Sequence, residues 1–406
     1  MAILSLLSTT AAAQGGAGIY RTYPETEIND TRAPQGYKPF YISHYGRHGS
    51  RYLEKKDQNS SVCAVLAKSD QKGLLTPAGK ALLRDLREFG KVSDGRYGQL
   101  SAVGEEEQQA LGKRMAKRFA PVFDVKSGKV VCVSSTASRC IMSMTNLTSE
   151  LKASNPSLDF SFLCGERYQR YIIAKDFVDT TRSVVAPYVT RYFTDNFDYD
   201  AFMGRYFIKI PKAPAGVEDR MMFIRTLLCN ASDVACTGEG PDLLKYFTDE
   251  ERRAAVANYD VYLYGNFCNS APAGHLRLRD AVVLVKDIVD RADASLGGNG
   301  VVADIRYGHD SAMMTLLSLV GIRGFEMSVM PCDAPAVWCS ADAMPMSSNL
   351  QIVFYRKRSG DAPVLVKLLF NEKEVAIPAL GDGPYYSWEA LRGYLTARME
   401  YFSGLE

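Results

Sequence analysis

Short segments rich in β-branched and aromatic residues alternate with helical patterns at both ends of the chain, and this alternation limits the possible folds most. Such segments are typical of strands, and the residues between them have apolar positions at helical spacing. This alternation predicts an α/β sandwich with a mostly parallel central sheet. The predicted strands are residues 38–45, 129–135, 158–164, 301–308, 350–356 and 363–370.

The middle of the chain has a different pattern. Residues 165–290 carry apolar residues at helical spacing and interrupt the α/β pattern. We therefore expect an inserted helical subdomain at 165–290, between a first part of the α/β core at 15–164 and a second part at 291–406. Open α/β sheets bind ligands beyond the carboxyl ends of their strands, so we expect the insert to lie over that edge. A length of 406 residues with 47% hydrophobic residues suits one large domain with an insertion, or two domains.

The overall charge is nearly balanced, with 48 Lys and Arg residues against 46 Asp and Glu residues and a net charge of +2. A nucleic-acid footprint over the whole molecule needs a larger basic excess, so we expect no nucleic-acid partner. Any electrostatic function must then be local. No stretch is long and apolar enough to span a membrane, and no feature of the sequence predicts an oligomeric state.

The first fourteen residues, MAILSLLSTTAAAQ, combine a short apolar run with a small-residue end. This resembles the back half of a secretory signal peptide whose positively charged start is missing. The alternative is a disordered N-terminal tail. A signal-peptide remnant at 1–14 predicts an exported protein, secreted or periplasmic.

Nine cysteines are consistent with an oxidising compartment but do not require one. Cys229 and Cys236, and likewise Cys332 and Cys339, are close enough in sequence to close small disulfide loops. For each pair, two buried reduced cysteines that act as small hydrophobic residues are an equal alternative. No spacing is CxxC and no histidine lies near the pairs, so we expect no zinc site.

The strand at 38–45 runs directly into the sequence RHGSR, residues 47–51. If the turn leads into a helix, Arg47 and Arg51 are four residues apart and their guanidinium groups converge beside His48. Arginine forms bidentate hydrogen bonds to phosphate oxygens, and Gly46 and Gly49 allow the backbone to approach a bound group closely.

The same arginines explain why a histidine is useful here. Their positive charge lowers the pKa of His48, which keeps the imidazole neutral and nucleophilic while the arginines bind the group that it attacks. Taken alone, the motif also suits a basic, solvated turn.

Two other segments bring polar residues to the same edge of the sheet. Arg139 lies in the first turns of a helix after the strand at 129–135, although it also suits a surface position. His309 and Asp310 follow the strand at 301–308 at the start of a helix. The alternative for Asp310 is an ordinary helix N-cap.

Together the three segments resemble the histidine acid phosphatases, the branch of the histidine phosphatase superfamily that includes phytases and multiple inositol polyphosphate phosphatases. The family's RHGxR motif stands here at 47–51, its S-T-x-x-R-x-x-x-S pattern at 135–143, and its late HD pair at 309–310. Residues 100–119 are similar to the family's L-T-x-x-G-x-x-Q helix, and residues 344–356 also match.

The match has two informative details. Leu53 stands where the family usually has proline, which puts the shape of the following loop in doubt. The late pair is HD, as in phytases and acid phosphatases, whereas multiple inositol polyphosphate phosphatases generally carry HAE. The resemblance therefore implies a phosphoglycerate mutase-like α/β sandwich with a phytase-like or general acid phosphatase activity.

The resemblance implies a two-step phosphoryl transfer. His48 attacks phosphorus to give a phosphohistidine, Asp310 protonates the leaving group, and water then hydrolyses the intermediate with Asp310 as the base. Positive charge must stabilise the equatorial phosphoryl oxygens throughout, because phosphate monoesters hydrolyse very slowly unaided. No cofactor and no metal is needed. The expected phosphate-binding residues are Arg47, Arg51, Arg139 and His309.

The substrate is a small-molecule phosphomonoester, with phytate or other inositol polyphosphates and sugar phosphates as the expected class. Lys55 and Lys56 are candidates for contacts with additional phosphates, and a solvated lysine pair is the alternative. A non-catalytic phosphate-ester binding protein would need the arginines but not His48 and Asp310. A mutase would return the phosphoryl group to its substrate instead of releasing phosphate.

Overall fold

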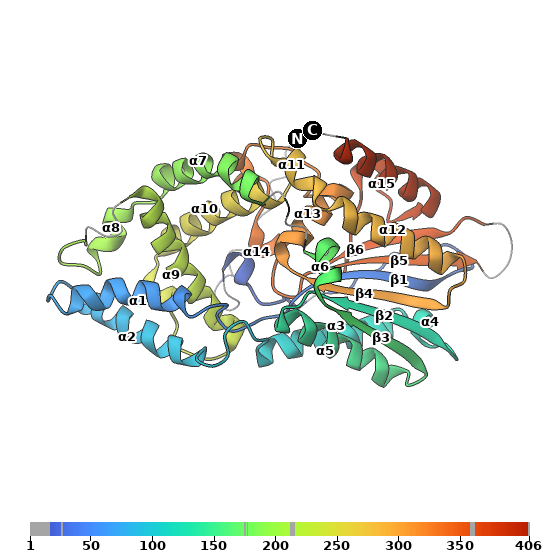
Figure 1. Ribbon diagram of the computed structural model, residues 1–406, viewed down its shortest axis with the longest axis horizontal. Coiled ribbons are helices and arrows are strands. Elements are labelled where there is room, and N and C mark those ends of the chain that lie inside the picture. Colours follow the sequence, from blue (N-terminus) through green and yellow to red (C-terminus); the bar gives the residue numbers. More distant parts are fainter. Residues whose placement is uncertain are drawn as a thin grey trace.

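The strands expected from the sequence are present, and they join in one sheet of eight strands (Figure 1). The structure, a computed structural model, describes residues 17–25, 27–173, 176, 178–211, 216–357 and 362–404. The signal-peptide prediction for residues 1–14 lies outside these residues. The strands are β1 (Tyr37–Arg47), β2 (Gly128–Ser134), β3 (Leu158–Cys164), β4 (Val301–Gly308), β5 (Asn349–Lys357), β6 (Leu365–Phe370), β7 (Lys373–Glu374) and β8 (Tyr385–Ser387).

The sheet has the strand order β3-β2-β4-β1-β5-β6-β7, and β8 pairs with β6. β3, β2, β4 and β1 are parallel neighbours. β6 points the same way as β1, because each of them runs antiparallel to β5. The predicted α/β fold with a mostly parallel central sheet is therefore confirmed.

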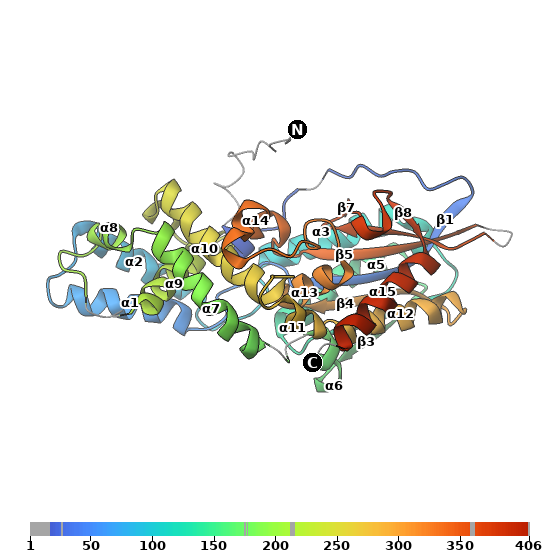
Figure 2. The same cartoon turned by 90° about the horizontal axis from the view of Figure 1, so that it is seen from above.

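Helices cover both faces of the sheet, as Figures 1 and 2 show. Side chains of β1 alternate between two apolar cores, with Tyr41 and Tyr45 in one and Ile42 in the other. The Ile42 core contains α3 (Ala102–Arg118), α4 (Ala120–Phe123) and α5 (Ser138–Ser154). The tyrosine core contains α11 (Gly274–Arg279), α12 (Val282–Leu296), α13 (Asp310–Val320) and α15 (Trp388–Ser403), and the shorter α6 (Glu166–Ile172) and α14 (Ser340–Ala343) lie nearby.

A third apolar core belongs to a helical part that lies beyond one end of the sheet, to the left in Figure 1. Its members from the middle of the chain are α7 (Val178–Asn196), α8 (Tyr199–Gly204), α9 (Val217–Thr237) and α10 (Asp249–Phe267). α1 (Asp57–Asp70) and α2 (Pro77–Val92) pack against α9 in the same core. The helical part is thus built from two separate stretches of chain, and the boundaries proposed at 165 and 290 stay predictions.

Two helices begin as their sequences indicate. The hydroxyl of Thr76 accepts a hydrogen bond from the backbone N–H of Gly79, with Pro77 as the first residue of α2. The hydroxyl of Ser101 likewise accepts from the backbone N–H of Gly104 at the start of α3. These local caps fix where each helix starts, and α3 thereby places its first turn beside the end of β1.

All nine cysteines are free. Cys229 and Cys236 both lie on α9, seven residues or about 10 Å apart along the helix axis, which is too far for a disulfide. Cys332 and Cys339 are also unpaired. The structure therefore favours the alternative of reduced thiols. Within the described residues, no helix has the length and apolar character needed to cross a membrane.

We predict that Gly104→Ala destabilises the protein by about 3 kcal/mol, because a Cβ atom there would lie 2.1 Å from the carbonyl oxygen of Ser50. Urea unfolding measures the change. Gly393→Ala is the matched control, since this helical glycine has open space around it and alanine should stabilise α15 by about 0.5–1 kcal/mol. Equal stability changes in the two variants would contradict the close contact at Gly104.

Candidate active site

Three neighbouring strands deliver the predicted residues to one place. Arg47 at the end of β1 is in register with Gly308 at the end of β4, and Ser134 of β2 is in register with Tyr307. The chain therefore leaves the sheet at the same level in all three strands. The rings of His48 and His309 follow directly, with their centroids 5.6 Å apart.

A cavity of about 470 Å³ lies at this edge of the sheet. Five of the predicted site residues line it: His48, Arg51, Arg139, His309 and Asp310. The helical part supplies another wall, chiefly from α10 and α7. These additional lining residues include Arg182, Tyr259, Tyr262, Leu263 and Phe267.

His48 is held in a form that suits a nucleophile. Its Nδ1 lies 2.9 Å from the carbonyl oxygen of Gly49, so Nδ1 carries the proton and Nε2 keeps its lone pair. Burial lowers the pKa of His48 well below its ordinary value, and the charges of Arg139 and Arg47 lower it further. The neutral imidazole is therefore strongly favoured over the protonated one.

The turn after β1 does not lead directly into a helix, so the condition for a helical alignment of Arg47 and Arg51 is not met. Residue Arg51 forms an isolated β-bridge with Leu100, and the backbone N–H of Ser101 donates to the carbonyl oxygen of Ser50. Arg47 is therefore held by β1, whereas Arg51 is held by its pairing with Leu100. The two arginines do not converge through helical spacing.

Gly49 makes close packing against α3 possible. A Cβ atom there would lie 2.8 Å from the carbonyl oxygen of Gly104, so a larger residue would push α3 away. Close approach of the Gly49 backbone to a bound group stays a prediction. The backbone N–H of Gly49 donates to the hydroxyl of Ser143 at 2.9 Å. Ser143 is the last residue of the serine-threonine-arginine motif, so that motif directly supports the turn.

α3 fixes the turn through two polar side chains that sequence reasoning missed. Glu107 accepts hydrogen bonds from the backbone N–H and the hydroxyl of Ser50, at 2.9 and 2.7 Å. Gln108 donates to the hydroxyl of Ser347 and accepts from that of Tyr307. Glu107 stands at the glutamine position of the family's L-T-x-x-G-x-x-Q pattern, so the signal was present in the sequence.

Leu53, the residue found in place of proline, is fully buried in the core of the helical part. Its backbone N–H donates to the hydroxyl of Ser93 at 3.3 Å. Proline has no N–H and cannot make this bond. The departure from the family pattern therefore has a local structural explanation.

Arg47 does not line the cavity. Its Nη1 donates to the carbonyl oxygens of Ile19 and Met344, at 2.8 and 2.7 Å, and its Nη2 lies 2.9 Å from Oδ2 of Asp310. Direct phosphate binding by Arg47 stays a prediction. The contact that the structure shows is with the carboxylate of Asp310.

Asp310 is the first residue of α13, with His309 in the N-cap position. Its Oδ1 accepts a hydrogen bond from the backbone N–H of Ser311 at 2.7 Å. Burial raises the pKa of the Asp310 carboxyl, but the charges of Arg47 and His309 more than offset this effect, and the pKa lies below its ordinary value.

Arg51 has a buried anionic partner that the sequence did not reveal. Its Nη1 lies 3.1 Å from Oδ2 of Asp233, a residue of α9 whose side chain is fully buried. Burial raises the pKa of Asp233, and the charge of Arg51 opposes that rise. The two residues are 182 positions apart, so only the fold brings them together.

Arg139 and His309 complete the group around His48. Arg139 lies at the start of α5, and its Nη2 donates to Oε1 of Glu54 at 3.2 Å. His309 Nε2 lies 3.3 Å from the hydroxyl of Ser135. Burial and then the charge of Arg139 lower the pKa of His309 to about 4. Both histidines are therefore neutral at pH 7.

The structure does not place Lys55 or Lys56 in the cavity. Both side chains are exposed, and neither is among the residues that line the wall around His48. Their neighbour Glu54 lines the cavity instead. A role for the two lysines in substrate specificity stays a prediction.

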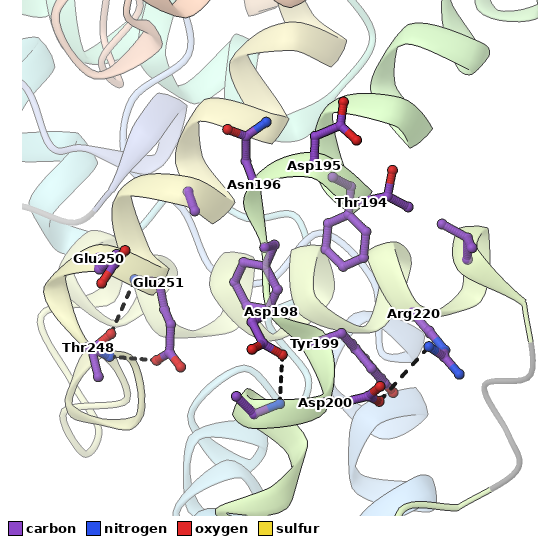
Figure 3. A pocket seen from close by; sticks show the side chains of 15 residues that line it. Thr194, Asp195, Asn196, Asp198, Tyr199, Asp200, Arg220, Thr248, Glu250 and Glu251 are labelled. Atoms are coloured by element: carbon purple, nitrogen blue, oxygen red, sulfur yellow. Dashed lines mark hydrogen bonds and ion pairs between the residues drawn. The ribbon is translucent and has the colours of Figure 1, made fainter.

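A larger cavity of about 820 Å³ lies in the helical part, between α7, α8 and the starts of α9 and α10 (Figure 3). Its lining is acidic. Oδ1 of Asp198 caps α8 by accepting from the backbone N–H of Ala201, and Glu251 completes the capping box of α10. The carboxylates there thus stabilise helix ends, and the lining contains no histidine, so this cavity is a poor candidate for phosphate chemistry.

The strand order defines a mixed α/β fold, and one edge of its sheet carries a pair of neutral histidines among arginines under a helical wall. No family model and no curated protein sequence matches the chain. Within the described ranges, no group of three or more His, Cys, Asp or Glu residues is arranged to hold a metal ion.

Solved structures share the fold over nearly the whole chain. The multiple inositol polyphosphate phosphatase of Bifidobacterium longum, in complex with inositol hexasulfate, matches at a TM-score of 0.79 and 19% identity, over 94% of this chain and 98% of its own. The phytase from D. castellii matches at 0.70 and 16%, over 95% and 84%. Hafnia alvei phytase in complex with tartrate matches at 0.57 and 12%, over 92% and 100%. The fold implied by the motifs is therefore confirmed.

We predict that the low pKa of His309 makes the protein less stable in acid. The unfolded chain binds a proton at this residue as pH falls through about 6.5, whereas the folded protein does so only near pH 4. Between these values the free energy of unfolding should fall by about 3 kcal/mol because of His309.

Urea unfolding from pH 7 to pH 4 in phosphate-free buffer tests this prediction. His309→Gln should remove that part of the fall, while His275→Gln, at an exposed position on α11, should retain it. Parallel pH curves for wild type and His309→Gln would contradict the assignment.

Proposed function

We propose that this protein is a phosphomonoester hydrolase that acts through a phosphohistidine intermediate. The observation that carries the proposal is the state of His48. Its Nδ1–H is fixed on the carbonyl oxygen of Gly49, and its neutral ring lines a cavity together with Arg51 and Arg139. A neutral imidazole beside guanidinium groups is suited to attack an anionic phosphoryl group.

In the first step, Nε2 of His48 forms a bond to phosphorus while the bond from phosphorus to the ester oxygen breaks. Arg51 and Arg139 supply positive charge, and neutral His309 supplies a hydrogen bond, to the equatorial oxygens. In the second step, water attacks phosphorus, the bond to Nε2 breaks and free phosphate leaves.

Asp310 is the proposed acid in the first step and the base in the second. Burial raises the pKa of its carboxyl, but the charge of Arg47 chiefly holds that pKa below its ordinary value. The negative charge of a bound phosphate acts in the opposite direction from Arg47 and favours the protonated acid. The lowered pKa of His48 favours the neutral nucleophile that the same step requires.

The comparisons support the choice of substrate class. The similar structures are an inositol polyphosphate phosphatase and phytases, and one of them binds inositol hexasulfate. We propose inositol polyphosphates or sugar phosphates as substrates for this chain, with a broad-specificity acid phosphatase as the alternative. Phosphate release from a panel of phytate, sugar phosphates and nucleotides at acidic and neutral pH separates these two.

A phosphate-ester binding protein remains the alternative of another class. It gives no reason for a fixed, neutral His48 that shares a cavity with the carboxylate of Asp310. We also propose export to the periplasm or the cell exterior, for which the apolar start of the sequence at 1–14 is the support.

Release of free phosphate in equal amount to the dephosphorylated product would dismiss a mutase.

We predict that rapid mixing with a labelled phosphomonoester produces an acid-labile phosphoprotein, and that His48→Ala abolishes it. The label should be stable in alkali, as phosphohistidine is and phosphoserine is not. Retention of the label on His48→Ala protein would overturn the assignment of the nucleophile.

For Asp310→Asn, we predict a loss that depends on the leaving group. Turnover of an inositol or sugar phosphate should fall by about 10²–10⁴-fold, because the departing alkoxide needs a proton. With p-nitrophenyl phosphate, phosphorylation of the enzyme should suffer much less, since the phenolate leaves without one. Single-turnover phosphorylation rates measure both, and an equal loss on the two substrates would remove Asp310 from this role.

A further inference from the structure

One carboxylate in the cavity has no part in the mechanism above. Glu54 lines the cavity, and its Oε1 accepts the hydrogen bond from Nη2 of Arg139 at 3.2 Å. Arg139 is one of the two cavity arginines proposed to bind the phosphoryl group. The guanidinium of Arg139 therefore already has an anionic partner within the protein before a phosphate binds.

The backbone around Glu54 is held by hydrogen bonds, whereas its side chain is partly exposed to solvent. The backbone N–H of Gly98 donates to the carbonyl oxygen of Leu53 at 2.7 Å, and that of Glu54 donates to Oε1 of Gln58 at 2.8 Å. The side chain of Glu54 is 42% exposed. Its carboxylate can move towards solvent without any change in the main chain.

Arg51, the other arginine proposed to bind the phosphoryl group, shows the contrast. Arg51 pairs with Asp233, whose side chain is fully buried on α9 and has no route to solvent. Removing that carboxylate from its partner would leave a buried charge unpaired, which is strongly unfavourable. Of these two ion pairs, the one between Arg139 and Glu54 is the pair that a ligand can open.

Arg139 also has unused hydrogen-bonding capacity. Its side chain is 13% exposed, and its Nε is buried and finds no hydrogen-bond partner within the described ranges. A guanidinium has five N–H donors in a planar fork, and one carboxylate oxygen of Glu54 satisfies one of them. A phosphate group offers three acceptor oxygens, so it can accept hydrogen bonds from more of these N–H donors than Glu54 does.

We propose that Glu54 is an exchangeable anionic partner of Arg139, which leaves when a phosphoryl group binds and returns when phosphate is released. The proposal rests on the proposed function, because it takes the competing anion to be the substrate phosphate and the product phosphate. Glu54 holds Arg139 in the cavity between turnovers and weakens the binding of the product. It is a positioning residue and takes no part in bond making.

The proposal predicts that neutralising Glu54 strengthens phosphate binding. Glu54→Gln keeps the size of the side chain but removes both the competing charge and its repulsion of the phosphate. Isothermal titration of the full-length protein with inorganic phosphate should show a dissociation constant about 5- to 20-fold lower than that of wild type. The inhibition constant of phosphate during turnover should fall by the same factor.

Two further variants show whether charge is the cause. Glu54→Asp retains the charge and should bind phosphate within about twofold of wild type. Glu239→Gln is the matched control, because Glu239 pairs with Arg96 at 3.3 Å with a similar exposure but lies outside the cavity. Its phosphate affinity should equal that of wild type.

A double-mutant cycle tests whether Glu54 acts through Arg139. The effect of Glu54→Gln should largely disappear in an Arg139→Ala background. Unchanged or weaker phosphate binding in Glu54→Gln, or the same strengthening with Arg139 absent, would overturn the proposal.

Phosphate binding is measured without turnover, so the hydrolase proposal and the Glu54 exchange proposal can each be refuted independently of the other. If no phosphomonoester is hydrolysed but Glu54→Gln still binds phosphate more tightly, exchange with an anion holds and the hydrolase proposal is wrong. If esters are hydrolysed and phosphate affinity does not respond to Glu54, only the exchange proposal is wrong.

Discussion

The parallel pairing of β1 with β4 is the constraint on which the rest of the site depends. Its register places Arg47 opposite Gly308, so the next residue of each strand is a histidine at the same edge of the sheet. The ladder of backbone hydrogen bonds fixes this relation more firmly than any side-chain contact. α13 then begins directly after β4 and brings Asp310 against Arg47.

Charge balance is the second constraint. Arginines that lie close together in and behind one cavity repel one another, and each needs a nearby anion. Asp310 on α13, Asp233 on α9 and Glu54 after the β1 turn fill this need for Arg47, Arg51 and Arg139 respectively. With the fixed positive charges retained and the imidazoles buried, protonation of the histidines is unfavourable. The same arrangement that binds an anion therefore keeps the nucleophile reactive.

Most of the fold and the principal site residues were predictable because their signals are local. Strand patterns, the caps at Thr76 and Ser101 and the RHGSR motif each depend on a few consecutive residues. Local spacing was less informative about the turn after β1. A helix there would have aligned Arg47 with Arg51, but pairing of the turn with residues near Leu100 decides its shape. Gly49 makes room for α3, a packing role that the local sequence does not reveal.

The sequence by itself determined which elements form and which residues end each strand, because backbone preference and hydrophobic period are properties of short segments. Tertiary structure alone decided which anion each arginine contacts and which of those contacts is open to solvent. Asp233 and Arg51 are separated by 182 residues, and no periodicity relates them. Their pairing follows from the packing of α9 against α1 and α3, on either side of the segment that carries Arg51, where burial of both charges makes any other arrangement costly.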